Sequence, residues 1–93
     1  MAKIELTVTA VASLDRLIVT HNLPSDTRAR VTSSIEPLER FPELGSSLTG
    51  VWAGLRFVLG PWRWMVIAYR YEEATNRVLV VAIEDGRSSR SAS

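Results

Sequence analysis

An unbroken run of six apolar residues, Val78 to Ile83, constrains the fold of this 93-residue chain more than any other feature. The run is far shorter than the roughly 20 apolar residues that a membrane helix needs. A strand that is apolar on both faces belongs inside a sheet rather than at its edge. The sequence therefore predicts a central strand, covered on both faces, within the segment Arg77 to Asp85.

Two further strands are predicted just before this one. Val51 to Leu59 forms the first and Trp62 to Tyr71 the second, with Gly60-Pro61 as the turn between them. Residues 72–76 connect the second strand to Arg77. Because both connections are short, we expect the three strands to form an antiparallel meander.

The N-terminal half predicts one strand and two helices. Lys3 to Thr9 alternates between apolar and polar residues, which is the period of a half-buried strand. Apolar residues then recur three and four positions apart along a helix capped by Thr9, and again along a helix capped by Ser25. The residues expected to face the core are Ile4, Leu6, Val8, Val11, Leu14, Leu17, Ile18, Val31, Ile35 and Leu38.

Two prolines bound the helical half. Pro37 either kinks the second helix or the helix stops near Glu36, because proline in a helix interior removes a hydrogen bond. Pro42 ends the helical half in either case. The helices need an apolar partner surface, and one face of the sheet is the only surface large enough. The predicted fold is therefore α+β with the order β-α-α-β-β-β, and the place of the first strand in the sheet is left open.

Composition bounds the domain and excludes several classes of function. Residues 1–85 form one predicted domain, and residues 86–93 a mobile Ser/Arg tail. The charged residues, 11 Lys and Arg against 10 Asp and Glu, give a net charge of +1, which excludes nucleic-acid binding by bulk charge alone. No cysteine is present, so disulfides, zinc ribbons and thiol nucleophiles are excluded. We expect a soluble cytoplasmic protein with no signal peptide, no metal and no cofactor.

Few residues offer catalytic chemistry. His21 is the single histidine and is expected at the end of the first helix, where a cation offsets the helix dipole. Of the two acidic pairs, Glu84-Asp85 is expected to cap the turn before Gly86, and Glu72-Glu73 to be solvated. No histidine-based metal cluster, nucleophile motif or phosphate-binding glycine loop is present.

Arginines interleaved with aromatic residues are the most distinctive feature. Arg56 and Arg63 are expected inside strands and Arg87 just past the last strand, and Trp62 and Trp64 flank Arg63. Such a surface can bind nucleic acid by stacking and phosphate contacts, or act as a protein–protein hot spot. The alternative is that the tryptophans fill the core and the arginines pair with the acidic residues.

A series of short motifs runs in order through residues 35–87. It consists of Leu38-Glu39-Arg40-Phe41-Pro42-Glu43-Leu44-Gly45, Leu48-Thr49-Gly50, Leu55-Arg56, Trp62-Arg63, Tyr69-Arg70-Tyr71 with Glu72-Glu73, and Val80-Val81-Ala82-Ile83 with Gly86-Arg87. In this order and spacing the motifs resemble the RelE/ParE family, the toxins of bacterial type II toxin–antitoxin pairs. The fold of that family is also β-α-α-β-β-β.

The resemblance implies a toxin that a cognate antitoxin neutralises, with a heterotetramer as one possible assembly. The ribonuclease members carry a lysine and arginine cluster and a C-terminal tyrosine. Here only Arg63 and Arg87 have counterparts. The resemblance therefore implies a ParE-like toxin, whose relatives poison DNA gyrase, and the residues expected to bind a partner are Trp52, Arg56, Arg63, Tyr69 and Arg87.

Two alternatives stay open at this stage. One is a ribosome-dependent mRNA endoribonuclease in which Arg56, Arg63 and Arg87 bind phosphate. This alternative lacks an evident general base, because His21 is remote in the chain. The other is a toxin-fold protein that has lost its activity.

Overall fold

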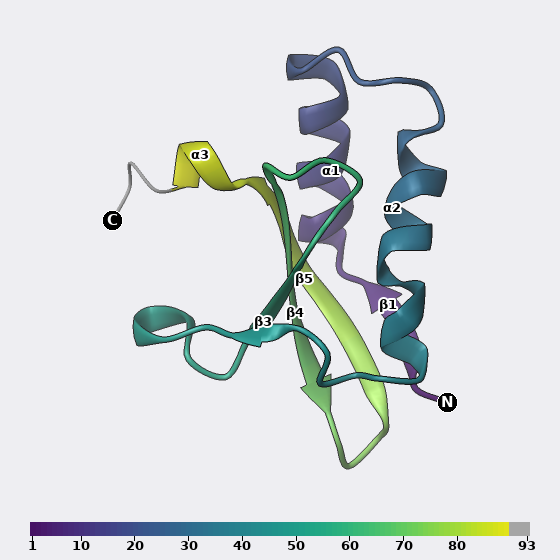
Figure 1. The fold of residues 1–93 in the computed structure, drawn as a ribbon, viewed down its shortest axis with the longest axis vertical. Helices are drawn as coiled ribbons and strands as arrows, with labels where there is room; N and C mark the ends of the chain where they lie inside the picture. Colours follow the sequence, from purple (N-terminus) through teal and green to yellow (C-terminus); the bar gives the residue numbers. More distant parts are fainter. Residues whose placement is uncertain (90–93) are drawn as a thin grey trace.

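The computed structural model describes residues 1–89 and consists of a five-stranded sheet with two main helices. Figure 1 shows α1 and α2 together on one side of the strands, while α3 and the loop that carries η2 project away from these helices. This arrangement confirms the predicted α+β fold. The elements in chain order are β1 (Lys3–Leu6), α1 (Val8–Thr20), α2 (Thr27–Ile35), the 3₁₀ turn η1 (Glu36–Glu39), β2 (Ser46–Ser47), the 3₁₀ turn η2 (Gly50–Trp52), β3 (Arg56–Leu59), β4 (Met65–Glu72), β5 (Arg77–Asp85) and α3 (Gly86–Ser89).

Strand β5 lies inside the sheet, as predicted, because the strand order is β1-β5-β4-β3-β2. It pairs with β4 in antiparallel fashion, and with β1 in parallel from Lys3 opposite Arg77 to Leu6 opposite Val80. The place of the first strand, left open by the sequence, is thus beside the last strand. We expected both faces of this strand to be buried, and only one is. Leu79 and Val81, which alternate with buried neighbours, are partly exposed on the other face.

The core lies between the helices and one face of the sheet. The helix residues Leu14, Val31, Ile35 and Leu38 are buried as predicted, and Ile4, Leu17 and Ile18 pack against them while partly exposed. The sheet contributes the buried residues Met65, Ile67, Tyr69, Val78, Val80 and Ile83.

Three residues predicted to face the core are exposed, and Val8 is one of them because β1 is shorter than expected. The strand ends at Leu6, and Thr7 rather than Thr9 caps α1 by accepting a hydrogen bond from the Ala10 N–H at 3.1 Å. Val8 therefore occupies the first helical position and is 86% exposed. Leu6 and Val11 are also exposed.

The second helix begins and ends close to its predicted limits. Asp26 rather than Ser25 occupies the N-cap position, and the helix stops at Ile35. Pro37 lies in the 3₁₀ turn that follows, so the proline ends the helix and does not kink it.

The two strands predicted around the first hairpin are shorter than expected. Gly50 and Gly54 adopt φ angles of +68° and +94°, which interrupt an extended chain, so the strand begins at Arg56 and Trp52 lies outside the sheet. After Pro61 the chain turns again, and the Met65 N–H donates to the Trp62 carbonyl at 3.0 Å. Residues 62–64 therefore belong to the β3–β4 loop, and Arg63 is not inside a strand.

The predicted tail falls partly within the described residues. Gly86–Ser89 form a short helical turn, and residues 90–93 lie outside the described part of the chain. Among the described residues, no helix is both long enough and apolar enough to cross a membrane.

We predict that Leu38→Ala lowers the free energy of unfolding by about 2–5 kcal/mol, because it leaves a cavity in the core. Leu38 is fully buried. Leu44, which is mostly exposed, provides the control, and Leu44→Ala should change stability by about 0.5 kcal/mol or less. Urea unfolding of both variants measures the difference. Equal effects would contradict the described core.

Candidate functional site

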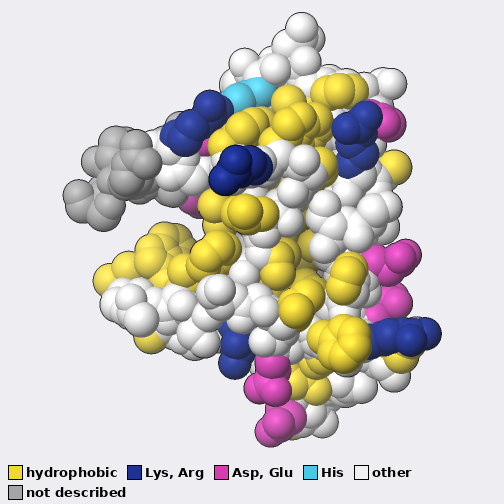
Figure 2. Space-filling model, viewed as in Figure 1, with side chains coloured by type: hydrophobic (Ala, Val, Ile, Leu, Met, Phe, Trp, Pro, Cys, Tyr) yellow, Lys and Arg dark blue, Asp and Glu magenta, His cyan; other side chains and the backbone are white. Residues whose placement is uncertain are grey.

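A cluster of aromatic and charged side chains gathers where α1 ends and β5 ends. It joins four separate parts of the chain, and we call it the aromatic–arginine cluster. Hydrophobic side chains gather beside the histidine in Figure 2, with Lys or Arg side chains flanking them. The contacts of the cluster join His21, Arg30, Trp62, Trp64, Asp85 and Arg87. Arg63 is included because it lies between the two tryptophans in the chain.

Stacked rings form the body of the cluster. The ring centroids of Trp62 and Trp64 lie 6.1 Å apart, and those of Trp64 and His21 lie 4.7 Å apart, with interplanar angles of 17° and 16°. Guanidinium groups lie over both tryptophans, Arg30 at 5.8 Å from the Trp62 ring and Arg87 at 5.3 Å from the Trp64 ring. Cations over indole faces are attracted by the ring electrons. The stack therefore couples α2, the β3–β4 loop, the end of α1 and the start of α3.

The Asp85 carboxylate is the polar centre of the cluster. Its Oδ2 accepts hydrogen bonds from His21 Nε2 and from Arg87 Nη2, each at 2.9 Å. Its Oδ1 accepts from the Arg87 Nε at 3.0 Å and from the Arg87 backbone N–H at 2.9 Å. The last bond confirms the expected turn-capping role.

These contacts change the acidity of the buried carboxylate. The hydrogen bonds from the Arg87 side chain hold the pKa of Asp85 well below its usual range, burial opposes them, and the bond from His21 adds to the lowering. Asp85 is therefore ionised in the folded protein, and its bonds depend on that charge.

His21 lies at the C-cap of α1, as predicted, but its contacts with other side chains were not predicted. His21 is remote in the chain from the other candidate residues, yet it lies beside Asp85, 64 residues later. Its Nδ1 is 2.9 Å from the Thr20 hydroxyl, so both ring nitrogens have partners within the chain. No local sequence pattern indicates this contact, because it depends on where α1 ends over the sheet.

Arg63 and Arg87 are the predicted site residues that the cluster brings together. The Gly86 N–H donates to the Trp64 carbonyl at 2.7 Å, which holds the loop next to the end of β5. Arg87 is engaged by Asp85, whereas Arg63 is exposed and makes no ion pair or side-chain hydrogen bond among residues 1–89. Arg63 is thus the cluster's available cation.

Arg56 and Tyr69 lie elsewhere and hold a loop in place. The Tyr69 hydroxyl donates to the Pro42 carbonyl at 2.8 Å and accepts from the Gly45 N–H at 2.9 Å. Arg56 Nη1 donates to the carbonyls of Gly45 at 2.8 Å and Glu43 at 3.2 Å. A Cβ at Gly45 would lie 2.6 Å from the Phe57 carbonyl, so only glycine allows this close approach.

Tyr69, one of the residues expected to bind a partner, is not at the surface of the described chain. Its side chain is fully buried on the helix-facing side of β4, and this burial raises the pKa of Tyr69. Trp52 is half-exposed in η2 and takes no part in the ring contacts described for the cluster.

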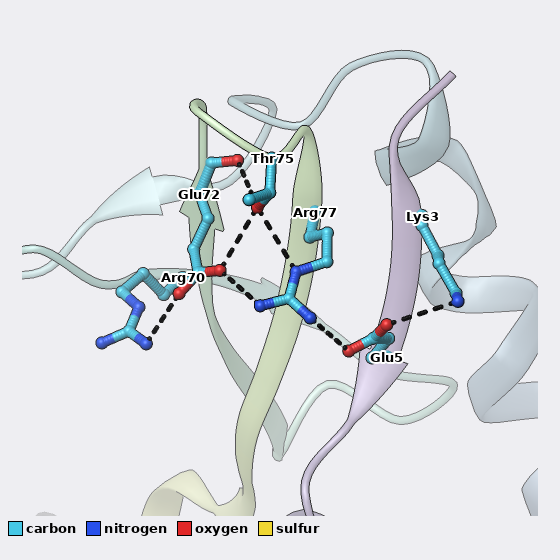
Figure 3. Close-up of polar contacts among 6 residues, drawn as sticks. All are labelled: Lys3, Glu5, Arg70, Glu72, Thr75 and Arg77. Carbon is cyan, nitrogen blue, oxygen red and sulfur yellow. Dashed lines mark hydrogen bonds and ion pairs between the residues drawn. The ribbon is translucent and has the colours of Figure 1, made fainter.

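At the opposite end of β5, charged side chains pair with one another. Figure 3 shows Arg77 between Glu5 and Glu72, with Lys3 and Arg70 at the two ends of the chain of ion pairs. The hydrogen bond from Arg77 lowers the pKa of Glu72 and raises that of Arg77. At this end of the sheet the arginines therefore pair with acidic residues, which is one of the two arrangements that the sequence left open. In residues 1–89 no three His, Asp or Glu side chains gather as a metal site.

Comparison with known proteins identifies solved structures that share this architecture. No protein-family model matches the sequence, and no curated protein matches it. Similar solved structures include the RelBE2 toxin–antitoxin complex of Mycobacterium tuberculosis, with 22% identity, a TM-score of 0.67 and coverage of 90% of this chain and 96% of that one. The chain has the RelE/ParE toxin fold.

Two further structures with this toxin fold are similar over nearly their whole lengths. The chromosomal ParDE system of P. aeruginosa is 16% identical with a TM-score of 0.66, covering 91% of this chain and 96% of that one. A metal-bound toxin of Helicobacter pylori is 14% identical with a TM-score of 0.70, covering 95% and 98%. The fold expected from the short motifs is therefore confirmed.

We predict that Asp85→Asn destabilises the protein at neutral pH and that this effect fades in acid. Because the folded pKa of Asp85 is lowered, the stabilisation is fully present above the unfolded pKa of about 3.9 and decreases as the pH falls below it. Urea unfolding of the native protein and the variant at pH 7, 5 and 3 measures the gap.

The matched control for this prediction is Asp26→Asn, which removes an exposed carboxylate that pairs with Arg30. It should have a small effect at every pH, since exposed ion pairs contribute little. A constant gap between the native protein and Asp85→Asn from pH 7 to pH 3 would contradict the role of the ionised carboxylate.

Proposed function

We propose that this chain is the toxin of a bacterial type II toxin–antitoxin pair and that a cognate antitoxin neutralises it in the cytoplasm. The support is the toxin fold, which covers at least 90% of the chain in similarity to proteins from two toxin–antitoxin systems. The aromatic–arginine cluster supplies a surface suited to a protein partner, because arginine and tryptophan dominate binding hot spots.

We further propose that the toxin inhibits growth by binding a macromolecular target, with DNA gyrase as the target that the sequence resemblance implies. The observation that carries this proposal is Arg63, an available guanidinium between two partly exposed tryptophans. A guanidinium beside aromatic rings binds carboxylates with directed hydrogen bonds. Trp52 and Arg87 are further proposed contacts, whereas Arg56 acts by holding the loop at Gly45.

Phosphodiester cleavage has weaker support from the same geometry. Of the three arginines considered for phosphate binding, Arg56 is used by loop carbonyls and Arg87 by a carboxylate. In the sheet, the Arg56 backbone of β3 lies opposite Tyr69 of β4. Arg87 instead follows the end of β5. The three arginines therefore do not form one phosphate site.

A ribonuclease remains the second candidate because of one observation. His21 lies in the cluster with Arg87 and Trp64, so an imidazole that can carry protons is present beside a cation and a stacking surface. His21 offers no evident general base in the sequence because it is remote in the chain, and this contact brings it beside Asp85. Both ring nitrogens are nevertheless bonded within the chain, which favours a structural role.

We predict a stable complex with the antitoxin encoded by the neighbouring gene. Co-expression followed by affinity purification measures the complex, and Arg63→Glu should reduce the recovered antitoxin at least several-fold. Arg40→Glu makes the same charge change at another exposed arginine and should have no effect. A chain that stays equally soluble and monomeric with or without the neighbour would contradict the pairing.

We predict that expression without the antitoxin slows growth and leaves transcripts intact. Growth curves, a gyrase supercoiling assay with purified protein and primer extension on cellular transcripts measure the three expectations. Arg63→Glu should relieve the growth defect, and Arg40→Glu should not. Transcript cuts abolished by His21→Ala would establish the ribonuclease instead, and unaffected growth would indicate an inactive toxin fold.

A further inference from the structure

The loop that carries Arg63 is attached to the end of β5 through Trp64. Within the loop, the Gly60 N–H donates to the Met65 carbonyl at 2.9 Å and closes the hairpin. Another backbone bond joins the loop to a different element, because the Gly86 N–H donates to the Trp64 carbonyl at 2.7 Å. The position of the loop relative to the sheet therefore depends on the start of α3.

Side chains that are bonded to Asp85 contact the Trp64 ring. The His21 ring stacks on it with centroids 4.7 Å apart, and the Arg87 guanidinium lies over it at 5.3 Å from the ring centroid. Both side chains donate hydrogen bonds to the Asp85 carboxylate. Asp85 also accepts from the backbone N–H of Arg87, which fixes the turn that begins at Gly86. The carbonyl and the ring of Trp64 are therefore both positioned by groups that Asp85 holds.

Asp85 itself lies below the surface that a partner can reach. It is 7% exposed, and each of its carboxylate oxygens already accepts two hydrogen bonds. Arg63 is exposed, and its two neighbours in the chain, Trp62 and Trp64, stack on each other with ring centroids 6.1 Å apart. The residues on both sides of Arg63 are thus held in place. A change at Asp85 reaches this surface through Trp64.

We propose that Asp85 is a positioning residue of the binding surface formed by the aromatic–arginine cluster. It contacts no partner, and it holds Trp64 and with it the loop that presents Arg63. Ordering a mobile side chain on binding costs affinity, and a loop that is already held avoids this cost. The inference rests on the proposed function, because it requires that the antitoxin binds this cluster.

Calorimetric titration of the full chain with the purified antitoxin of the neighbouring gene tests the inference. Asp85→Asn replaces one acceptor oxygen with an NH₂ group, which cannot accept from His21 or Arg87. We expect this variant to bind the antitoxin at least about fivefold more weakly. Asp15→Asn is the matched control, since it removes a carboxylate that pairs with Arg28 outside the cluster, and it should bind like the native protein. Circular dichroism establishes that each variant is folded at the assay temperature.

Two readouts separate positioning from a general loss of stability. The first is a double-mutant cycle that combines Asp85→Asn with Arg63→Glu. If Asp85 acts through the loop, the double variant binds no more weakly than Arg63→Glu alone, because coupled residues are not additive. The second readout needs no partner and is acrylamide quenching of tryptophan fluorescence. Quenching should increase in Asp85→Asn and not in Asp15→Asn, because Trp64 becomes more accessible when its contacts loosen.

His21→Ala carries the test if Asp85→Asn fails to fold. This variant removes the ring that stacks on Trp64 and leaves the bonds from Arg87 to Asp85 in place. We expect a smaller loss of binding, at least about twofold, together with increased quenching.

Three results would overturn the inference. They are a folded Asp85→Asn or His21→Ala variant that binds the antitoxin as tightly as the native chain, unchanged quenching, and losses of binding that simply add in the double variant with Arg63→Glu. A native chain that binds no antitoxin contradicts the proposed function and this role of Asp85 together. Native binding that Asp85→Asn leaves intact contradicts the role of Asp85 alone.

Discussion

The parallel pairing of β1 with β5 is the constraint on which the arrangement of this protein depends. It joins the first strand of the chain to the last, and it ends at Val80, where the Thr7 N–H and hydroxyl both donate to the Val80 carbonyl. From that point α1 rises about 20 Å over its 13 residues. The strand advances about 17 Å between Val80 and Asp85. The end of the helix therefore reaches the end of the strand, and this match in length brings His21 to Asp85.

Asp85 links the side chains that meet where α1 and β5 end. Its carboxylate accepts hydrogen bonds from His21 at the C-cap of α1 and from Arg87 in α3. The Trp64 ring contacts both of these side chains, because the His21 ring stacks on it and the Arg87 guanidinium lies over it. A buried carboxylate without such donors would carry a large desolvation cost. The aromatic–arginine cluster is thus held by one ionised group. The proposed binding surface and the stability of the cluster therefore depend on the same residue.

Local pattern was sufficient to predict most of the fold and insufficient for its details. Periodicity placed Leu14, Val31 and Leu38 on the core side, and the run Val78 to Ile83 identified the interior strand. The boundaries were wrong where backbone geometry overrides pattern, as at Gly54 with its positive φ. Val8 was misplaced for a similar reason, because an alternating pattern does not reveal where a cap such as Thr7 ends a strand.

The candidate site was predictable only in part, because its contacts join residues far apart in the chain. Arg63 was identified from its aromatic neighbours and Arg87 from its place just past the last strand, and the structure brings both to the same end of the sheet. The bond between His21 and Asp85 has no local signal, since it depends on the length of α1. Tyr69 was misjudged because a strand residue can face either side, and only the sheet register places its hydroxyl against the loop at Gly45.

The arginines show how a nearly neutral chain can still present a specific cation. Arg77 lies between two glutamates, Arg56 holds loop carbonyls, and Arg87 is engaged by Asp85. Each of these guanidinium groups makes its hydrogen bonds to other parts of the same chain. Arg63 differs because the β3–β4 loop holds it outside the strands, between two tryptophans that pack on the core. A partner that recognises this surface therefore meets a rigid aromatic base with one uncommitted guanidinium, and such preorganisation reduces the entropy lost on binding.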